Sequence, residues 1–530
     1  MTVRKLSGHP EEAAVSEIAH RAYRVIAGRF PICAASDEFY FFPQVVDEQR
    51  NWSFWDDFSA DSIEKVAHDL RLLEHELEKS RAGPLGRDAR IDADLVRSVL
   101  QTLREQLVDV APHRSQPTFH LTVVAAGLAE ALAAEPPAWT ARLAGLPPFL
   151  KRAASCLDRV PRLFLRSGRE MLTDLLAWTD QLQRSGRETG ALRPALATFG
   201  AALDKISGTD DYRMSEGLLA RLVDSHMACG LTIEQATADL TLEFHDMQNV
   251  LESEASRLAA GLDWREVERR LPFCTAPEGS LLKLYALELE RLERHCREHG
   301  LVPENLVRSQ NLQLKNVPAQ LEAIRASDAY SATPGYPPQG GTFYVLSCRA
   351  QGPEGKIGRS LEYRMTAIHE AWPGHHLLDQ ARWSLNREVR RPIEHPLFYE
   401  GWACLAEELM ARTGYLDGPW DRFLLARRRI ARAARGLVDL GLQVGSMTLE
   451  QAIELLVRAG YRPGEARRVI PKYLLRPGYQ LCYTIGLRQG LQLLEAHDRQ
   501  EIGPLVRKVL AHGEVGFERL AKILADETGR

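Results

Sequence analysis

The stretch His369–His376, which reads HEAWPGHH, packs three imidazoles and a carboxylate into eight residues. A His-Glu pair followed by a second His on the same helix is the zincin arrangement, in which two His nitrogens hold zinc and the Glu acts as general base. Neutral imidazole is also the commonest metal ligand among protein side chains. We therefore predict a zinc site in which His369 is a ligand and Glu370 is the base.

The spacing within this stretch departs from the usual zincin pattern HExxH. The position four residues after His369 is Pro373, which cannot hold a metal, and the next imidazoles are those of His375 and His376. A proline kinks or ends a helix, and the glycine that follows it frees the next peptide. We predict a helix that ends or bends at Trp372 and folds a later His back towards His369. His375 is the preferred second ligand because it needs the smaller fold-back, and His376 is the alternative.

Length and composition bound the class of protein. A chain of 530 residues can bury a large core and predicts two or more domains or lobes. It is 45% hydrophobic and 26% charged with a formal net charge of −4, so we expect a globular protein with neither nucleic acid nor membrane as partner. The first residues lack the apolar core of a signal peptide, and the longest apolar run, 121–134, is too short to span a bilayer. We expect a cytoplasmic protein.

The cysteines give no sign of a zinc ribbon or a redox pair. No two of them form a C-x-x-C pair, which is typical of reduced thiols in a cytosol. The eight cysteines are Cys33, Cys156, Cys229, Cys274, Cys296, Cys348, Cys404 and Cys482.

Apolar residues at spacings of three and four predict a succession of helices in the first half of the chain. The aromatic-rich stretch Phe30–Trp55 is irregular, and we interpret it as a loop packed over these helices, with the wall of a substrate channel as the alternative. The expected helices are 11–26, 61–80, 91–110, 121–134, 169–184, 192–206, 215–229, 232–260 and 279–299.

The composition shifts after residue 327, where Gly and Pro cluster up to residue 358. Within this part, 342–347 (TFYVLS) carries β-branched and aromatic residues and predicts a strand. We expect it to be an edge strand beside the metal-binding helix, where an extended substrate could bind through its backbone. Helical pattern resumes at Leu361. We place an N-terminal helical lobe at 1–270 and a C-terminal lobe with the metal site at 271–530.

The motif HEAWPGHHLL resembles the HExxPGHH signature of the bacterial family called domain of unknown function 885. That family is grouped with the zinc metallopeptidases of the gluzincin type, so the resemblance implies a zinc hydrolase. It extends over about residues 335–490, in which further motifs follow in the family's order. The N-terminal half is similar only in its helical character, and the resemblance names no substrate.

The segment 398–407, FYEGWACLAE, resembles the family's EGWAxxAE helix and is similar to the NEGFA helix of gluzincin aminopeptidases. Since the Glu of that helix is a zinc ligand, the resemblance implies that Glu400 is the third ligand. Its alternative role is a carboxylate that complements a helix N-terminus. Glu407, two turns further along the same face, would orient a ligating His. Cys404 could offer a thiolate, although a small buried apolar side chain is the favoured interpretation.

The segment 476–486, RPGYQLCYTIG, resembles the family's PGQAxxYxIG stretch. Tyr479 replaces the family's Gln, which leaves the role of that position open. Tyr483 matches, and its phenol is expected to donate a hydrogen bond to the developing oxyanion; a packed core tyrosine is the alternative. Arg476 and Arg488 are nearby cations that could pair with a substrate carboxylate, or else cover helix surfaces.

Two further histidine groups are weaker candidates. The segment His295–His299, HCREH, fits the inverted H-x-x-E-H pattern, but Gly300 follows at once. His and Arg in a last helical turn favourably meet the helix dipole, so we favour an exposed helix end. His395 precedes Glu400 by five residues and is interpreted as a loop histidine.

The sequence predicts a mainly α, multi-helical, two-lobed zincin-like metallopeptidase fold with one small sheet beside the metal helix. Zn²⁺ would be held by His369, His375 and Glu400, with Glu370 as base and Tyr483 as oxyanion donor. The expected substrate is a small peptide or amide. Two His and one carboxylate also describe non-haem iron enzymes, and a catalytically inactive helical binding protein is the remaining alternative.

Overall fold

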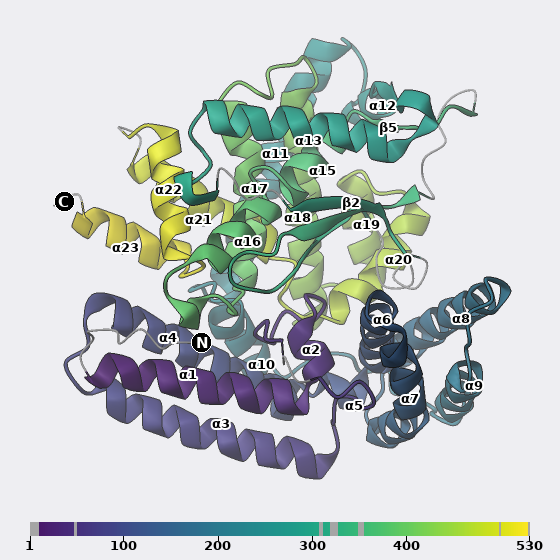
Figure 1. The fold of residues 1–530 in the computed structure, drawn as a ribbon. Helices are drawn as coiled ribbons and strands as arrows, with labels where there is room; N and C mark the ends of the chain where they lie inside the picture. The colour runs from purple at the N-terminus through teal and green to yellow at the C-terminus, as the bar shows by residue number, and fades with distance from the viewer. Residues whose placement is uncertain are drawn as a thin grey trace. The chain divides into compact units, whose positions relative to one another are not determined.

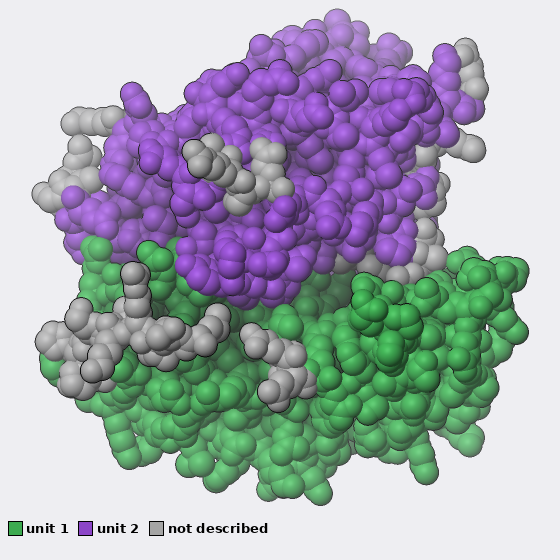
Figure 2. All heavy atoms as spheres, in the orientation of Figure 1, with its two compact units in different colours: residues 1–211, 319–324, 385–394 green, residues 212–318, 325–384, 395–530 purple. Residues whose placement is uncertain are grey.

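The computed structural model describes residues 10–46, 50–306, 311–318, 327–347, 355–497 and 500–527, and it is mainly helical (Figure 1). The expectation of a mainly α fold is thus confirmed. Figure 2 colours two compact units. The first holds the described chain up to Asp211 and Leu385–Glu394, and the second holds Tyr212–Pro318, Arg325–Ser384 and the chain from His395 onward. The predicted boundary at residue 270 therefore differs from this division, which follows Asp211.

The first unit consists of helices. Several begin with a proline, whose fixed φ suits the first helical position, and Ser59 caps α3 by accepting from the Ser62 backbone N–H. Its elements are α1 (Pro10–Arg29), α2 (Pro31–Ala35), α3 (Ala60–Arg81), α4 (Arg87–Glu105), the π-helical turn η1 (Gln106–Val110), α5 (Pro112–Ser115), α6 (Pro117–Ala133), α7 (Pro136–Cys156), α8 (Arg162–Arg184), α9 (Leu192–Leu203) and the 3-10 turn η7 (Glu388–Arg390).

The aromatic stretch after α1 belongs to the core of this unit. Phe30 stacks on Phe58 with ring centroids 5.0 Å apart, and Trp55 stacks on Phe149 at 4.9 Å. These four rings are buried, as expected for a segment packed over the helices. Sequence periodicity did not predict α7, because Pro147 and Pro148 lie inside it and proline normally marks a helix boundary.

The second unit contains the strands and the predicted metal-binding segments. Its elements up to the sheet region are α10 (Glu216–Arg221), the π-helical turn η2 (Leu222–His226), α11 (Ile233–Leu258), α12 (Trp264–Glu268), β1 (Phe273–Thr275), η3 (Pro277–Gly279), α13 (Leu281–Glu298), η4 (Glu304–Leu306), β2 (Leu312–Asn316), β3 (Ala329–Ala332), β4 (Gly341–Val345) and β5 (Gly358–Ser360). The helices that follow are α15 (Tyr363–Glu370), α16 (His375–Ser384), α17 (Pro396–Arg412), α18 (Asp421–Gln443), α19 (Leu449–Arg458), α20 (Pro463–Leu474), α21 (Cys482–Ala496), α22 (Ile502–His512) and α23 (Phe517–Glu527). Among the described helices, none combines the length and the apolarity that crossing a bilayer requires.

A close helix crossing lies at the centre of the second unit. α17 packs along α21, and α11 packs along α18. A Cβ atom added to Gly401 in α17 would lie 2.6 Å from Gly486 Cα in α21, and one added to Gly486 would lie 2.4 Å from the Leu397 carbonyl oxygen. Only glycine at these two positions lets the helices approach so closely. The crossing brings Glu400, beside Gly401, near the first turns of α21.

The predicted strand near residue 342 is present as β4, but it is not an edge strand. β4 lies between β2, which runs parallel to it, and β3, which runs antiparallel. Because β3 contacts α16, β3 is the edge strand beside the predicted metal-binding segment. The sequence misled here because β2 and β3 lack the β-branched and aromatic run of β4.

Candidate metal centre

The stretch HEAWPGHH forms two helices joined by a tight connection. α15 ends at Glu370 and α16 begins at His375, which confirms the predicted break. The connection returns to α15, where the Gly374 N–H donates to the Ile368 carbonyl over 3.1 Å. A Cβ on Gly374 would lie 1.9 Å from the His369 carbonyl oxygen, so only glycine permits this approach. The Trp402 indole N–H of α17 donates to the Pro373 carbonyl over 2.9 Å and ties the connection to the next helix.

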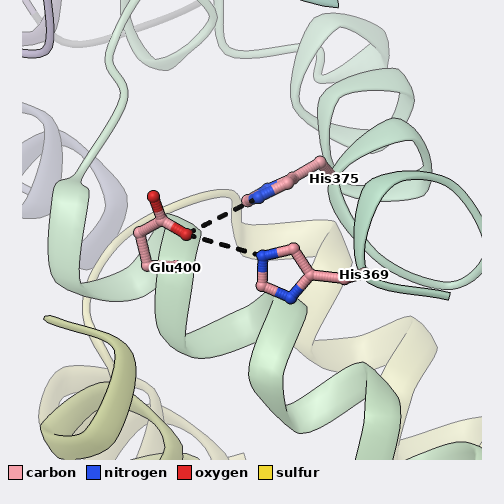
Figure 3. A group of neighbouring side chains, drawn as sticks. All are labelled: His369, His375 and Glu400. Atoms are coloured by element: carbon pink, nitrogen blue, oxygen red, sulfur yellow. Dashed lines mark ion pairs between the residues drawn. The ribbon is translucent and has the colours of Figure 1, made fainter. Parts of the chain in front are cut away.

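This connection brings two imidazoles to one carboxylate (Figure 3). His369 Nε2 and His375 Nε2 each lie 3.7 Å from Glu400 Oε2. One ligand atom from each of the three residues lies within 4.8 Å of the others, and all three side chains are buried. Over the described residues this is the one group of three or more His, Cys, Asp or Glu so arranged. The structure thus assembles the three residues predicted as metal ligands.

The ring of His369 is oriented from behind by a carboxylate. Its Nδ1 lies 3.1 Å from Glu407 Oε1, so the Nδ1 proton would point to Glu407 and the Nε2 lone pair to Glu400. Arg432 donates to both oxygens of Glu407, with Nη2 at 2.6 Å and Nη1 at 2.9 Å, and Arg428 adds contacts of 3.1–3.2 Å. Burial by itself would raise the pKa of Glu407. The two guanidinium groups outweigh this effect and hold the pKa of Glu407 well below its usual range. Glu407 occupies the orienting position that its spacing from Glu400 suggested.

His375 and His376 point in different directions. The ring of His375 stacks on Tyr399 with centroids 4.0 Å apart, and its Nε2 faces Glu400. Burial lowers the pKa of His375 to about 3, so the imidazole is neutral, as a metal ligand must be. His376 instead contacts Tyr330, whose hydroxyl lies 3.4 Å from its Nδ1. Of the two candidates, the structure brings His375 to Glu400 and His369.

Glu400 accepts hydrogen bonds from two phenols. The hydroxyl of Tyr479 lies 2.7 Å from its Oε1, and that of Tyr483 lies 2.8 Å from the same oxygen. Burial would raise the pKa of Glu400, but His369, His375 and Tyr479 favour the anion and lower the pKa to about 2. The carboxylate therefore presents Oε2 to the imidazoles and Oε1 to the phenols.

Glu370 is held by the edge strand. The Tyr330 backbone N–H of β3 donates to its Oε2 over 2.8 Å. Burial raises the pKa of the Glu370 carboxyl to about 7, although His369 and the Tyr330 N–H act in the opposite sense. The predicted base thus interacts electrostatically with His369 and Glu400, and a backbone group rather than a charged side chain fixes its orientation.

The family model described as "Bacterial protein of unknown function (DUF885)" matches residues 48–523. The chain belongs to this family. As a DUF885 protein it resembles two solved structures over nearly their whole lengths: a candidate lipoprotein of unknown function from Shewanella oneidensis and a candidate lipoprotein from Colwellia psychrerythraea. The Shewanella structure has a TM-score of 0.73 and 16% sequence identity, and the match covers 96% of this chain and 99% of that one. The Colwellia structure has a TM-score of 0.76 and 16% sequence identity, and the match covers 98% of this chain and 99% of that one. This likeness shows the fold. No curated protein matches the chain.

The other candidates of this DUF885 chain lie outside the assembled group. Burial raises the pKa of Cys404 to about 12, so it is a protonated, buried thiol. The rings of His295 and His299 stack at 3.9 Å, and their nitrogens face Thr413 Oγ1 and the His295 carbonyl. The His395 backbone N–H donates to Glu514 Oε2 over 2.8 Å. None of these four residues joins the three assembled side chains, within the part of the chain that the structure describes.

Sequence reasoning missed the arginines of α18. The helix carries Arg428 and Arg432 one turn apart, and both contact Glu407 behind His369. The available signal was the run ARRRIARAARG, in which a mostly buried helix places arginine on every turn. Buried arginine is rare unless it is paired, so this run predicted buried carboxylate partners.

Proposed function

We propose that this protein is a zinc-dependent hydrolase that cleaves peptide or other amide bonds of small substrates. The observation that carries the proposal is the convergence of His369 Nε2, His375 Nε2 and Glu400 Oε2 beside Glu370. Two nitrogens, one carboxylate and a neighbouring acid are the protein groups of catalytic zinc sites that leave one position open for water. The zincin-like character of the fold is part of this proposal and rests on the placement of the His-Glu pair at the end of α15, close to a short sheet.

The distances from the two imidazole nitrogens to the carboxylate, and the chemistry of the three donors, fit a zinc ion. Nitrogen and oxygen ligands about 2.0–2.2 Å from tetrahedral zinc are separated from each other by roughly 3.3–3.5 Å. The two imidazole nitrogens lie 3.7 Å from Glu400 Oε2, which is close to that separation and too long for a hydrogen bond. The contact between Glu407 and His369 Nδ1 also leaves the Nε2 lone pair of His369 for a metal.

Each residue of the site has a distinct task in amide hydrolysis. Bound zinc would lower the pKa of a water towards ~7 and polarise the substrate carbonyl. Glu370, oriented by the Tyr330 N–H, would take the proton of the attacking water and pass it to the leaving amine. The Tyr483 hydroxyl, at the edge of the site, would donate a hydrogen bond to the oxyanion that develops on the carbonyl.

A non-haem iron enzyme is the second candidate, because two His and one carboxylate also form its ligand set. The acid next to His369 favours hydrolysis, since that chemistry needs a proton acceptor beside the ligands and iron oxygenases do not. A binding protein without activity would not need Glu370 to be fixed by a backbone N–H. Metal analysis and an oxygen-uptake assay on the purified protein separate these three functions.

The test of the proposal combines metal content with a screen of short peptides that have free or blocked termini. Protein purified without chelators is expected to hold about one zinc per chain, and His369→Ala or Glu400→Ala should each remove most of it. Glu370→Gln should keep the zinc and the circular dichroism spectrum while activity falls by about a hundredfold or more, because only the base is lost. Wild-type protein without zinc, or a fully active Glu370→Gln, would refute the proposal.

A further inference from the structure

Arg435 in α18 is a partly buried cation without an anionic partner. Its guanidinium forms no ion pair and no hydrogen bond with any residue that the structure describes, and its Nε is buried. Its electrostatic neighbours are the phenols of Tyr461, Tyr473 and Tyr483, together with the cation Arg432. A charge that is taken out of water without a partner costs free energy, so an arginine in this position calls for a functional explanation.

The other inward-facing arginines of α18 all have carboxylate partners. Arg427 pairs with Glu268, Arg429 with Glu243, and Arg432 with Glu407. The carboxylate one turn after Arg435 is that of Asp439, which instead accepts from the Gln480 backbone N–H over 3.1 Å. Carboxylates of α12, α11 and α17 therefore neutralise these three arginines, and the guanidinium of Arg435 stays unmatched.

Arg435 lies beside the candidate metal centre. Its guanidinium carbon is 4.3 Å from the centroid of the Tyr483 ring, and the Tyr483 hydroxyl donates to Glu400 over 2.8 Å. One phenol ring thus separates the cation from a predicted zinc ligand. Stacking on the ring holds the flat guanidinium in place and leaves its N–H groups available, because cation–π contact uses the face of the ring rather than hydrogen bonds.

We propose that Arg435 binds a carboxylate of the substrate, so that the preferred substrates are short peptides or N-acyl amino acids with a free carboxylate next to the scissile amide. This inference rests on the proposed hydrolase function and names its substrate class. The planar guanidinium of arginine binds a carboxylate through two parallel hydrogen bonds. The carboxylate of the substrate would thus supply the negative charge that no neighbouring helix supplies to Arg435.

The arginines suggested by the sequence fit this role less well. Arg488 Nη2 lies 3.1 Å from Asp239 Oδ1, and its Nη1 lies 3.9 Å from Glu243 Oε2, so its charge is already matched. The guanidinium carbon of Arg476 lies 5.7 Å from the centroid of the Tyr479 ring, farther than Arg435 lies from the ring of Tyr483. Arg435 combines proximity to the site with an unmatched charge.

The experiment compares N-acetyl dipeptides that carry a free C-terminal carboxylate with the same peptides as C-terminal amides. Zinc-loaded wild-type enzyme is expected to prefer the acids in kcat/KM by about a hundredfold, the loss typical when one partner of a buried charge pair is missing. Arg435→Gln should reduce this acid-to-amide ratio to about one, and Arg435→Lys should give an intermediate ratio. Arg488→Gln, which removes a matched cation, is the control and should keep the wild-type ratio.

Two further measurements separate failure of this inference from failure of the hydrolase proposal. Because Arg435 loses no ion pair, Arg435→Gln should keep its zinc and melt at the wild-type temperature or above it; Arg435→Met serves in its place if the first variant does not fold. Titration calorimetry should show that zinc-loaded wild type binds N-acetylalanine more tightly than N-acetylalaninamide, and that Arg435→Gln does not discriminate.

Equal hydrolysis of acids and amides by the wild type, or an unchanged acid-to-amide ratio in Arg435→Gln, overturns the role of Arg435 and leaves the hydrolase proposal intact. If wild type hydrolyses no probe, the calorimetry decides the role of Arg435 alone.

Discussion

Tyr483 donates a hydrogen bond of 2.8 Å to Glu400 Oε1, on the side of the carboxylate that faces away from the two imidazoles. Tyr479 donates to the same oxygen over 2.7 Å. Both phenols therefore occupy Oε1 in this structure, which leaves Oε2 as the oxygen for a metal. Tyr479 is buried and Tyr483 is partly exposed, so Tyr483 is the phenol that we expect to turn to a substrate.

The two phenols should differ in what their removal changes. Tyr483→Phe is expected to lower kcat about a hundred- to thousandfold with little change in KM or zinc content, as loss of an oxyanion donor does. Tyr479→Phe is expected to weaken zinc about ten- to hundredfold, because a group that orients a ligand is lost. Steady-state kinetics and zinc titration check both variants. Similar effects of the two changes on kcat and on zinc would contradict this division of roles.

The two neighbouring histidines should separate cleanly in metal content. His375→Ala is expected to lose most of its zinc, because the Nε2 that faces Glu400 is gone. His376→Ala should keep it, because its ring faces Tyr330. Elemental analysis of both purified variants checks the assignment. Zinc loss in His376→Ala alone would transfer the ligand role to His376.

Glu407 should matter for both the metal and the fold. Glu407→Gln removes the charge that Arg428 and Arg432 share, and breaking a buried pair typically costs about 3–5 kcal/mol of unfolding free energy. It should also weaken zinc about ten- to hundredfold, since the carboxylate orients His369. Denaturant unfolding and zinc titration measure the two effects. Glu408→Gln is the matched control, because the adjacent Glu408 pairs with Arg429 rather than with Arg428 or Arg432.

The crossing of α17 and α21 should not tolerate a methyl group. Gly401→Ala places a Cβ 2.6 Å from Gly486 Cα, and overpacking of this kind typically costs about 1–3 kcal/mol. The separated helices should also lengthen the contact between Tyr483 and Glu400 and reduce activity. Gly464→Ala, at an exposed position in the first turn of α20 with nothing within 4 Å of its Cβ, should instead stabilise the protein by up to about 1 kcal/mol. Thermal unfolding of the pair decides whether the close approach is required.

The local part of the site could be predicted from the sequence. The Pro-Gly pair within HEAWPGHH indicated where the helix breaks, and α15 does end just before it. The choice of His375 over His376 followed from the same fold-back, and the structure brings His375 to Glu400. These features depend on a few consecutive residues, whose backbone preferences act without help from the remainder of the chain.

The partners across helices could not be predicted in this way. The sequence did not indicate that Arg432 would hold Glu407, that Tyr479 would join Tyr483 on Glu400, or that Arg435 would remain unmatched. Periodicity states which side of a helix is buried, but not which residue of another helix it meets.

What the sequence by itself determined is therefore the helical class of the chain, the break between α15 and α16, and the set of side chains able to hold a metal. What only the tertiary structure decided is their mutual placement: the edge position of β3, the hydrogen bond from its Tyr330 N–H to Glu370, and the orientation of Glu400 by two phenols. The physical reason is that these contacts join residues distant in sequence. Their geometry is fixed by close packing, here by the meeting of Gly401 and Gly486, rather than by local conformational preference.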